Sequence, residues 1–326
     1  MKQRTLGGRL AVAEIGYGCF GLSGVYGAAD DAQSIAVIRK AVELGVTMLD
    51  TADAYGPFHN ETLVGRALQG IRDKVIVATK FGQVRKPDGS RTVCGTPQYV
   101  REACEASLKR LGIETIDLYY QHRLDKTVPI EDTVGAMAEL VRAGKVRLLG
   151  LSEVGPATLR RAHKVHPITA VQSELSLWSR QDVSVVLPVC RELGVGYVAY
   201  SPLGRGFLTG TVTAPAELEQ NDVRRTMPRF DAGNIAENRE ITRRIGELAR
   251  AKGATAAQLA IAWVLAKGPD IVPIPGTRSE ARLAENLQAA EIALSPAEVA
   301  QLEAAAPAGS VKGERYGAWM MGTIDR

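Results

Sequence analysis

The first half of the chain contains four ionisable residues whose types and spacing could perform acid–base chemistry: Asp50, Tyr55, Lys80 and His122. Asp50 follows an apolar run at 46–49, and a polar turn ending in glycine then carries Tyr55. Lys80 ends a β-branched run at 75–79, and His122 follows a run at 116–121. Short apolar runs bounded by turn signals are typical of buried strands. Each residue alone could be a turn cap, a packed ring, a solvated strand end or a core histidine. Ionisable groups after three consecutive strands together indicate a site.

The chemistry that this set can perform is proton donation to a carbonyl oxygen. A tyrosine phenol has an ordinary pKa near 10, and a neighbouring ammonium such as Lys80 is expected to lower the pKa of Tyr55. Asp50 is expected to hold Lys80 through a salt bridge, so that Tyr55 acts as a general acid near neutral pH. A neutral His122 could hydrogen-bond the same oxygen. This machinery suits hydride transfer to a carbonyl, with the hydride supplied by a cofactor.

Strand and helix patterns alternate along the whole chain, at a spacing of roughly 30 residues per unit. Gly7 and Gly8 separate two short apolar runs, which predicts an N-terminal hairpin with a two-residue turn. A polar segment at 211–234 is expected to be a surface loop. Strands are expected near 15–17, 48–50, 75–80, 116–121, 146–151, 170–174, 197–200 and 271–274. Helices are expected near 31–44, 60–68, 97–111, 130–143, 156–166, 185–193, 238–252, 255–266 and 279–289, with a short extra helix after Ser295.

This order predicts an α/β fold, a (β/α)8 TIM barrel with an N-terminal β-hairpin and extra helices, as one domain over residues 1–326. The carboxyl ends of barrel strands face one mouth, so the four ionisable residues should converge there. A doubly wound sheet is the alternative, because residues 16–21 (GYGCFG) match a G-x-G-x-x-G pattern. No helix is expected directly after that match and no acidic ribose partner ends the next strand, which favours the barrel.

Composition narrows the classes of protein that the chain could belong to. The net charge is +4, from 40 basic and 36 acidic residues, which does not indicate a nucleic-acid partner. No apolar stretch reaches about 18 residues, so no membrane span is expected, and the charged N-terminus does not read as a signal peptide. The four cysteines have neither metal nor redox spacing, so we expect no metal site and a cytoplasmic location.

Further motifs extend along the chain in a fixed order. They are residues 49–56 (LDTADAYG), 78–80 (ATK), 119–125 (YYQHRLD), 144–147 (GKVR), 150–152 (GLS), 172–174 (QSE), 199–206 (AYSPLGRG), 274–278 (IPGTR) and 282–286 (RLAEN). With these motifs the sequence resembles the aldo-keto reductases over essentially its whole length, and in particular the branch that includes pyridoxal and perakine reductases. The family's catalytic Asp, Tyr, Lys and His correspond to Asp50, Tyr55, Lys80 and His122.

The resemblance implies NADPH/NADP+ as the cofactor, bound across the barrel mouth without a Rossmann fold. It implies that Ser152 and Gln172 hold the nicotinamide carboxamide, that Tyr200 stacks on the ring, and that the 201–205 loop covers the pyrophosphate. Arg282 could pair with a 2′-phosphate through its planar fork, and Gly276 and the following helix offer free amides to a phosphate. The full set of expected cofactor contacts is Gly18, Phe20, Asp50, Ser152, Gln172, Tyr200, Ser201, Pro202, Leu203, Arg205, Gly276, Thr277, Arg278, Arg282, Glu285 and Asn286.

The substrate is expected to be a small carbonyl compound of unspecified structure. Expected substrate contacts are Tyr26, Tyr55, Phe58 and His122, with Trp178 and Trp319 as further candidate walls. The 211–234 segment and the tail at 311–326 are expected to shape this pocket. Two positions depart from many relatives: Glu153 replaces the Asn after the carboxamide-binding Ser, and Phe20 stands where Met is common.

Two other functions are compatible with the same residues. A non-catalytic, cofactor-sensing subunit of the potassium-channel β type would share the fold, although the intact set of four argues against it. A lyase could use Lys80 as a Schiff-base amine, but Asp50 would keep that amine charged. A homo-oligomer is possible.

Overall fold

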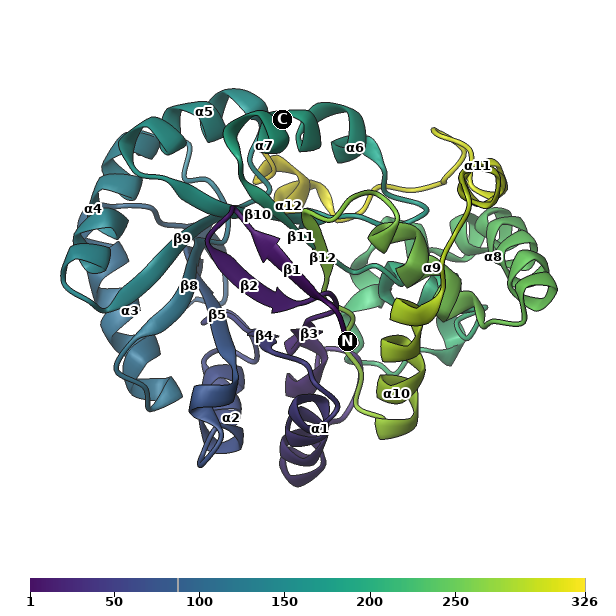
Figure 1. Cartoon of the computed structure of the whole chain (residues 1–326), viewed down its shortest axis with the longest axis horizontal. Coiled ribbons are helices and arrows are strands. Elements are labelled where there is room, and N and C mark those ends of the chain that lie inside the picture. The colour runs from purple at the N-terminus through teal and green to yellow at the C-terminus, as the bar shows by residue number, and fades with distance from the viewer. Residues whose placement is uncertain (87, 326) are drawn as a thin grey trace.

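An eight-stranded parallel β-barrel with helices around its outside forms the centre of the molecule (Figure 1). A computed structural model describes residues 1–86 and 88–325 of the chain. Neighbouring strands pair in the order β12-β11-β10-β9-β8-β5-β4-β3. The N–H groups of Gly16 and Gly18 donate to the carbonyls of Pro273 and Pro275, at 3.0 and 3.4 Å, and these bonds join the first strand to the last. The barrel strands are β3 (Tyr17–Gly18), β4 (Met48–Asp50), β5 (Ile76–Phe81), β8 (Ile116–Gln121), β9 (Val146–Ser152), β10 (Ile168–Glu174), β11 (Gly196–Tyr200) and β12 (Ile271–Pro273).

The helices begin and end where the local sequence provides caps. In α3, the Thr96 hydroxyl accepts from the N–H of Tyr99, Pro97 occupies the first turn, and Gly112 follows with φ 64°. The α-helices of the described residues are α1 (Asp31–Glu43), α2 (His59–Ala67), α3 (Pro97–Leu111), α4 (Ile130–Arg142), α5 (Pro156–Val165), α6 (Gln181–Val185), α7 (Leu187–Leu193), α8 (Ala232–Lys252), α9 (Ala256–Leu265), α10 (Glu280–Gln288), α11 (Pro296–Ala305) and α12 (Ala318–Gly322). Each helical connection between barrel strands returns the chain to the end at which the strands begin. All barrel strands therefore run in the same direction, and their carboxyl ends lie together at the other end.

The predicted N-terminal hairpin lies across the end of the barrel at which the strands begin (Figure 1). It is formed by β1 (Gln3–Leu6) and β2 (Leu10–Ala13). Leu6 pairs with Leu10, so the turn contains three residues and not the predicted two. Gly7 has φ 58°, and a Cβ atom there would lie 2.5 Å from the Thr169 carbonyl oxygen. The turn therefore requires glycine both for its dihedral angle and for its close approach to the barrel.

Some predicted boundaries are wrong for identifiable reasons. The helix expected at 185–193 begins two residues later, as α7, and a separate short helix, α6, precedes it. Pro188 lies in the first turn of α7 and cannot continue the hydrogen bonding of α6. Helix α8 begins at Ala232, six residues before the expected start, because Ile235 is already buried on its inner face. Part of the expected 211–234 loop forms short 3-10 turns. The doubly wound alternative is excluded, since residues 16–21 lead into the 3-10 turn η1 (Phe20–Ser23) and not an α-helix.

Two short elements that the sequence did not predict lie beside the barrel mouth. A hairpin of β6 (Gln83–Arg85) and β7 (Arg91–Val93) follows β5, and α12 follows a tail segment after α11. Residues from both elements line the cavity described below. They therefore belong to the walls of the site and not to the core.

Candidate active site

Asp50, Tyr55, Lys80 and His122 converge at the carboxyl ends of β4, β5 and β8, as predicted. The Lys80 ammonium donates to Asp50 Oδ1 at 2.5 Å, to the Thr51 carbonyl at 2.7 Å and to Tyr55 Oη at 3.1 Å. These three bonds use all three donors of a protonated lysine. Because Tyr55 Oη accepts from Lys80, its own O–H remains able to donate to another acceptor.

Burial decides the electrostatics of this group. Lys80 is fully buried. Burial alone would lower the pKa of Lys80, but the charge of Asp50 and the Tyr55 phenol outweigh that effect and raise it, so the amine stays protonated. Lys80 acts on the pKa of Tyr55 in the expected direction, but its effect does not decide the net pKa. Burial raises the pKa of Tyr55 by more than the Lys80 charge lowers it. Tyr55 is therefore a protonated phenol at neutral pH.

His122 faces Tyr55, with the two ring centroids 5.8 Å apart in an edge-to-face arrangement. Burial and the nearby charges of Arg123 and Lys80 hold the pKa of His122 well below its ordinary value of 6.5. The imidazole is therefore neutral, as the proposed chemistry requires. Its Nδ1 atom has no hydrogen-bond partner among the described residues. A neutral imidazole beside the Tyr55 hydroxyl can help to hold one oxygen atom between the two rings.

A cavity of about 1200 Å³ opens at the same end of the barrel. Its wall includes Asp50, Tyr55 and His122, whereas Lys80 lies behind them and does not line it. All of the expected cofactor contacts and the four expected substrate contacts line this cavity. Phe20 lies between Tyr26 and Tyr55, at centroid distances of 5.5 and 4.9 Å, and so forms part of the pocket wall beside Tyr55.

The part of the cavity next to β12 has the features expected for a phosphate-bearing ligand. Gly18 and Gly276 approach so closely that a Cβ on Gly276 would lie 2.3 Å from the Gly18 oxygen. Helix α10 begins next, capped by Ser279, and Arg282 lies exposed in its first turn. Arg282 has no ion pair among the described residues, so its guanidinium can reach a ligand. Arg278 instead donates to the carbonyls of Tyr26, Gly27 and Ala28, which fastens the 26–28 loop.

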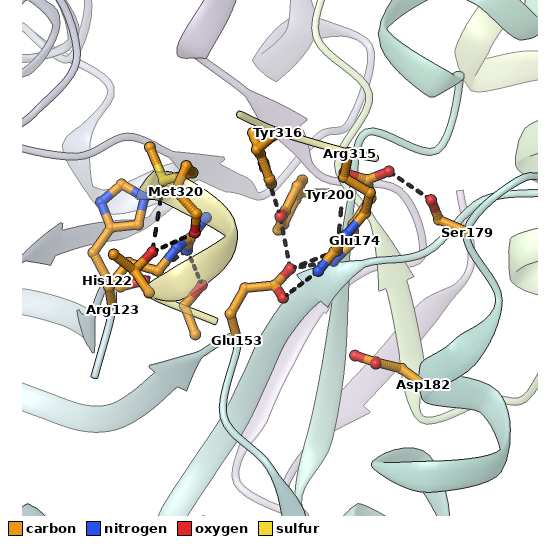
Figure 2. Close-up of polar contacts among 12 residues, drawn as sticks. His122, Arg123, Glu153, Glu174, Ser179, Asp182, Tyr200, Arg315, Tyr316 and Met320 are labelled. Carbon is orange, nitrogen blue, oxygen red and sulfur yellow. Dashed lines mark hydrogen bonds and ion pairs between the residues drawn. The ribbon is translucent and has the colours of Figure 1, made fainter. Parts of the chain in front are cut away.

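The residues predicted to hold the nicotinamide lie on adjacent strand ends. Ser152 pairs with Gln172 across β9 and β10, and Glu174 pairs with Tyr200 across β10 and β11. Gln172 Nε2 donates to Asp50 Oδ2 at 2.7 Å, which links this group directly to the Lys80 cluster. The Tyr200 hydroxyl donates to Glu153 Oε1 at 2.6 Å. The ring of Tyr200 is thus tethered at its outer end (Figure 2).

Backbone strain is concentrated around the cavity. Within residues 1–86 and 88–325, the non-glycine residues with positive φ are Phe58, Glu153, Ser201 and Arg205, with φ between 51° and 68°. Phe58, Ser201 and Arg205 line the cavity, and Glu153 follows the cavity residue Ser152. Such conformations persist only where the surrounding contacts enforce them, and they cluster at functional sites. The loop after β11 is therefore held in a shape that its sequence alone would not prefer.

The sequence missed several residues of this site. Arg123 is buried, lines the cavity, and donates to the His122 carbonyl at 2.7 Å and to Ser152 Oγ at 3.3 Å. Arg123 follows His122 directly, so extending the predicted site by one residue past the strand end would have included it. Arg315 and Tyr316 contact the site from the C-terminal tail, and no motif in the neighbouring sequence indicates that they do so. Trp178 was wrongly expected at the wall, because it stacks on Phe207 at 4.5 Å outside the cavity.

The tail was correctly expected at the cavity, since residues 316–320 line it; Arg326 lies outside the described residues. Within residues 1–86 and 88–325, no cluster of three or more potential metal ligands is present. No helix in the same residues combines the length and apolar character needed to cross a bilayer.

Comparison with known proteins gives consistent matches over nearly the whole chain. The model of the Aldo/keto reductase family matches residues 14–307. A probable aldo-keto reductase 1 of Glycine max is 48% identical over 307 residues, which cover 94% of this chain and 88% of that protein. The solved glycerol dehydrogenase of Gluconobacter oxydans superposes with a TM-score of 0.85 at 27% identity, covering 93% of this chain and 94% of that one. An aldo/keto reductase of Klebsiella pneumoniae, solved with NADP and acetate, gives 0.75 at 28% identity, covering 97% and 99%.

Proposed function

Since this chain belongs to the aldo/keto reductase family, we propose that it reduces an aldehyde or ketone to an alcohol with Tyr55 as the proton donor. The observation that carries the proposal is the set of three bonds made by Lys80. They hold the Tyr55 oxygen as an acceptor from Lys80 and direct its proton to the cavity. A substrate carbonyl oxygen placed between Tyr55 and His122 would receive that proton.

The enzyme is an oxidoreductase that uses NADP(H). The residues that line the cavity fit this cofactor. The close approach of Gly18 and Gly276, the start of α10 and the exposed Arg282 suit a phosphate-bearing nucleotide. Ser152 and Gln172 lie beside the cluster of Asp50, Tyr55, Lys80 and His122 and would hold the nicotinamide. Arg282 would pair with the 2′-phosphate. When bound, NADPH supplies the hydride that the carbonyl carbon accepts.

Each of the four residues has a distinct task in this proposal. Tyr55 donates the proton, and Lys80 stabilises the negative charge that forms on the Tyr55 oxygen as the proton leaves. Asp50 keeps Lys80 charged and in place, with Gln172 holding the second carboxylate oxygen. Neutral His122 orients the substrate oxygen. A Schiff-base role for Lys80 is disfavoured, because that role needs a deprotonated amine and the pKa of Lys80 is raised.

The test is a fluorescence titration with NADPH and NADH, followed by NADPH oxidation assays with a panel of aldehydes and ketones. Tight NADPH binding with turnover supports the reductase. In the Tyr55→Phe variant, turnover should fall by roughly 100-fold or more, since a general acid contributes about that much, with little change in NADPH affinity.

Tyr99→Phe is the matched control, because Tyr99 also lines the cavity but makes no bond to Lys80. It should leave turnover nearly unchanged. Full activity in the Tyr55→Phe variant would show that Tyr55 is not the proton donor. Binding without turnover on every carbonyl would instead indicate a cofactor-sensing protein.

A further inference from the structure

Glu153 is a buried carboxylate that connects three strand ends to the C-terminal tail (Figure 2). Its Oε1 accepts from the Glu174 N–H at 3.1 Å and from the Tyr200 hydroxyl at 2.6 Å. Arg315 grips both carboxylate oxygens, at 3.0 and 2.8 Å. Burial opposes the charged form, but the charges of Arg315 and Arg123, with the hydrogen bonds from Arg315 and Tyr200, lower the pKa of Glu153 to about 2. Glu153 is therefore the receptor for an arginine of the tail.

The tail is fastened on both sides of this ion pair. Upstream, the main chain of Lys312 makes two hydrogen bonds with the Asn238 side chain of α8: its N–H donates at 2.9 Å and its carbonyl accepts at 3.0 Å. The next carbonyl, of Gly313, accepts from Arg229. Downstream, the Asp325 N–H donates to the Glu153 carbonyl at 3.0 Å, and its carboxylate accepts from the Gly155 N–H at 2.9 Å. Residues 312–325 thus run over the ends of β9, β10 and β11.

Tyr316 links the tail to two residues of the proposed cofactor site. Its hydroxyl lies 2.8 Å from the Tyr200 hydroxyl and 2.7 Å from Arg205 Nη2, which donates to it. Arg205 also donates to Tyr26 Oη at 3.3 Å and to Glu174 at 3.5 Å. Tyr200 and the strained Arg205 therefore both depend on the tail for their position.

We propose that Arg315 and Tyr316 form a C-terminal clasp that positions Tyr200 for the nicotinamide ring and Arg205 for the pyrophosphate next to it. The inference rests on the proposed NADPH site, in which Tyr200 stacks on the nicotinamide ring and the 201–205 loop covers the pyrophosphate that joins the nicotinamide to the adenosine half. Arg315 and Tyr316 are positioning residues, since they act through Tyr200 and Arg205. Among the described residues, no hydrogen bond or ion pair joins them to residues 276–286, where the adenosine half is expected. The clasp should thus affect one half of the cofactor and not the other.

This separation can be measured with two ligands on the full-length protein. NADPH and adenosine 2′,5′-bisphosphate, which lacks the nicotinamide half, are titrated by fluorescence or calorimetry against Arg315→Met, Arg315→Lys and Tyr316→Phe. Arg315→Met should weaken NADPH at least tenfold and the bisphosphate by less than twofold. Arg315→Lys keeps the charge but not the planar fork, so its loss should be intermediate. Tyr316→Phe should weaken NADPH by about threefold, the effect of one or two hydrogen bonds.

Lys312→Met is the matched control, because Lys312 belongs to the same tail but bonds to Asn238 only through its main chain. Among the residues that the structure describes, its exposed side chain pairs only with Glu237, at 3.7 Å. It should change neither affinity. Equal weakening of both ligands in Arg315→Met, or unchanged NADPH affinity in both Arg315→Met and Tyr316→Phe, would overturn the clasp. If Arg315→Met fails to fold, Tyr316→Phe decides alone, since it keeps the ion pair. A wild-type protein that does not bind NADPH would refute the proposed function, and the clasp with it.

Discussion

At the scale of single residues, His122 shows how a side chain's role depends on its protonation state. Burial and the charges of Arg123 and Lys80 keep its imidazole neutral well below pH 6.5, so in the proposed reaction it can orient a substrate oxygen without competing with Tyr55, the proposed acid. The sequence alone could place His122 at a strand end, because the run at 116–121 that predicts the strand lies directly before it. It could not give the pKa of Tyr55, since the burial that raises this pKa depends on side chains from several strands. Position was therefore predictable, but the balance between burial and charge was not.

The substitution His122→Asn tests this role. Asparagine keeps a neutral polar group near the same place but loses the imidazole geometry, so kcat should fall by roughly 100-fold, typical of losing one oriented donor. The melting temperature should change little. In the wild type, kcat/KM should not fall as the pH decreases through 6.5, because His122 takes up no proton there. A large loss of thermal stability in the variant would instead make His122 a core residue.

Arg282 determines the predicted preference between the two nucleotides. It is exposed at the start of α10 and unpaired among the described residues, so it can pair with a 2′-phosphate that NADH lacks. Arg282→Ala should weaken NADPH at least tenfold and leave NADH nearly unchanged, as measured by fluorescence titration. Arg243→Ala, on the exposed face of α8, is the control. Equal losses for both nucleotides would contradict this assignment.

At the scale of elements, local signals fixed some boundaries and not others. Helix α3 could be predicted residue by residue, because Thr96, Pro97 and Gly112 act within a few positions of each other. The hairpin of β6 and β7, helix α12 and the contacts of the tail could not be predicted. Glu153 and Arg315 are 162 residues apart in sequence, and neither lies in a pattern that names its partner. An ion pair of this kind becomes visible only once the barrel has brought β9 and the tail together.

The ion pair of Glu153 predicts how stability depends on pH. Its folded pKa of about 2 lies below the ordinary 4.5, so the unfolded state binds a proton first as the pH falls. The carboxylate therefore contributes stability above pH 4.5, on the order of 3 kcal/mol, which is lost as the pH falls towards 2. Urea unfolding should show Glu153→Gln far less stable than wild type at neutral pH, with the gap narrowing below pH 4.5.

The exposed substitution Glu247→Gln is the control for that measurement and should change stability by less than about 0.5 kcal/mol at any pH. A Glu153→Gln gap of constant size between pH 7 and pH 3 would show that the carboxylate's charge does not carry the stabilisation.

At the scale of the whole molecule, the order of elements was predictable because it repeats. Eight strand patterns separated by helix patterns allow few arrangements, and a closed parallel barrel places every strand end on one mouth. The proposed reaction takes place at that mouth, so residues at the opposite end of the barrel can contribute to folding stability without taking part in it. There the N-terminal hairpin covers the barrel, with Leu6, Leu10 and Val12 joining the interior core. Arg4 donates to the carbonyls of Leu265, Gly268 and Ile271 beside the start of β12.

This division predicts that stability and cofactor binding can be changed separately. Leu6 is fully buried and so close to the first residue of β11 that a Cβ on Gly196 would lie 2.6 Å from its side chain. Leu6→Ala should therefore leave a cavity and cost 2–5 kcal/mol, on the order found for buried leucines, while the NADPH dissociation constant stays unchanged. Leu44→Ala makes the same change at an exposed position and should cost less than about 0.5 kcal/mol. Chemical unfolding and fluorescence titration of both variants provide the measurement. Weakened NADPH binding in folded Leu6→Ala would mean that the hairpin influences the mouth through the barrel, because no residue of the hairpin lines the cavity itself.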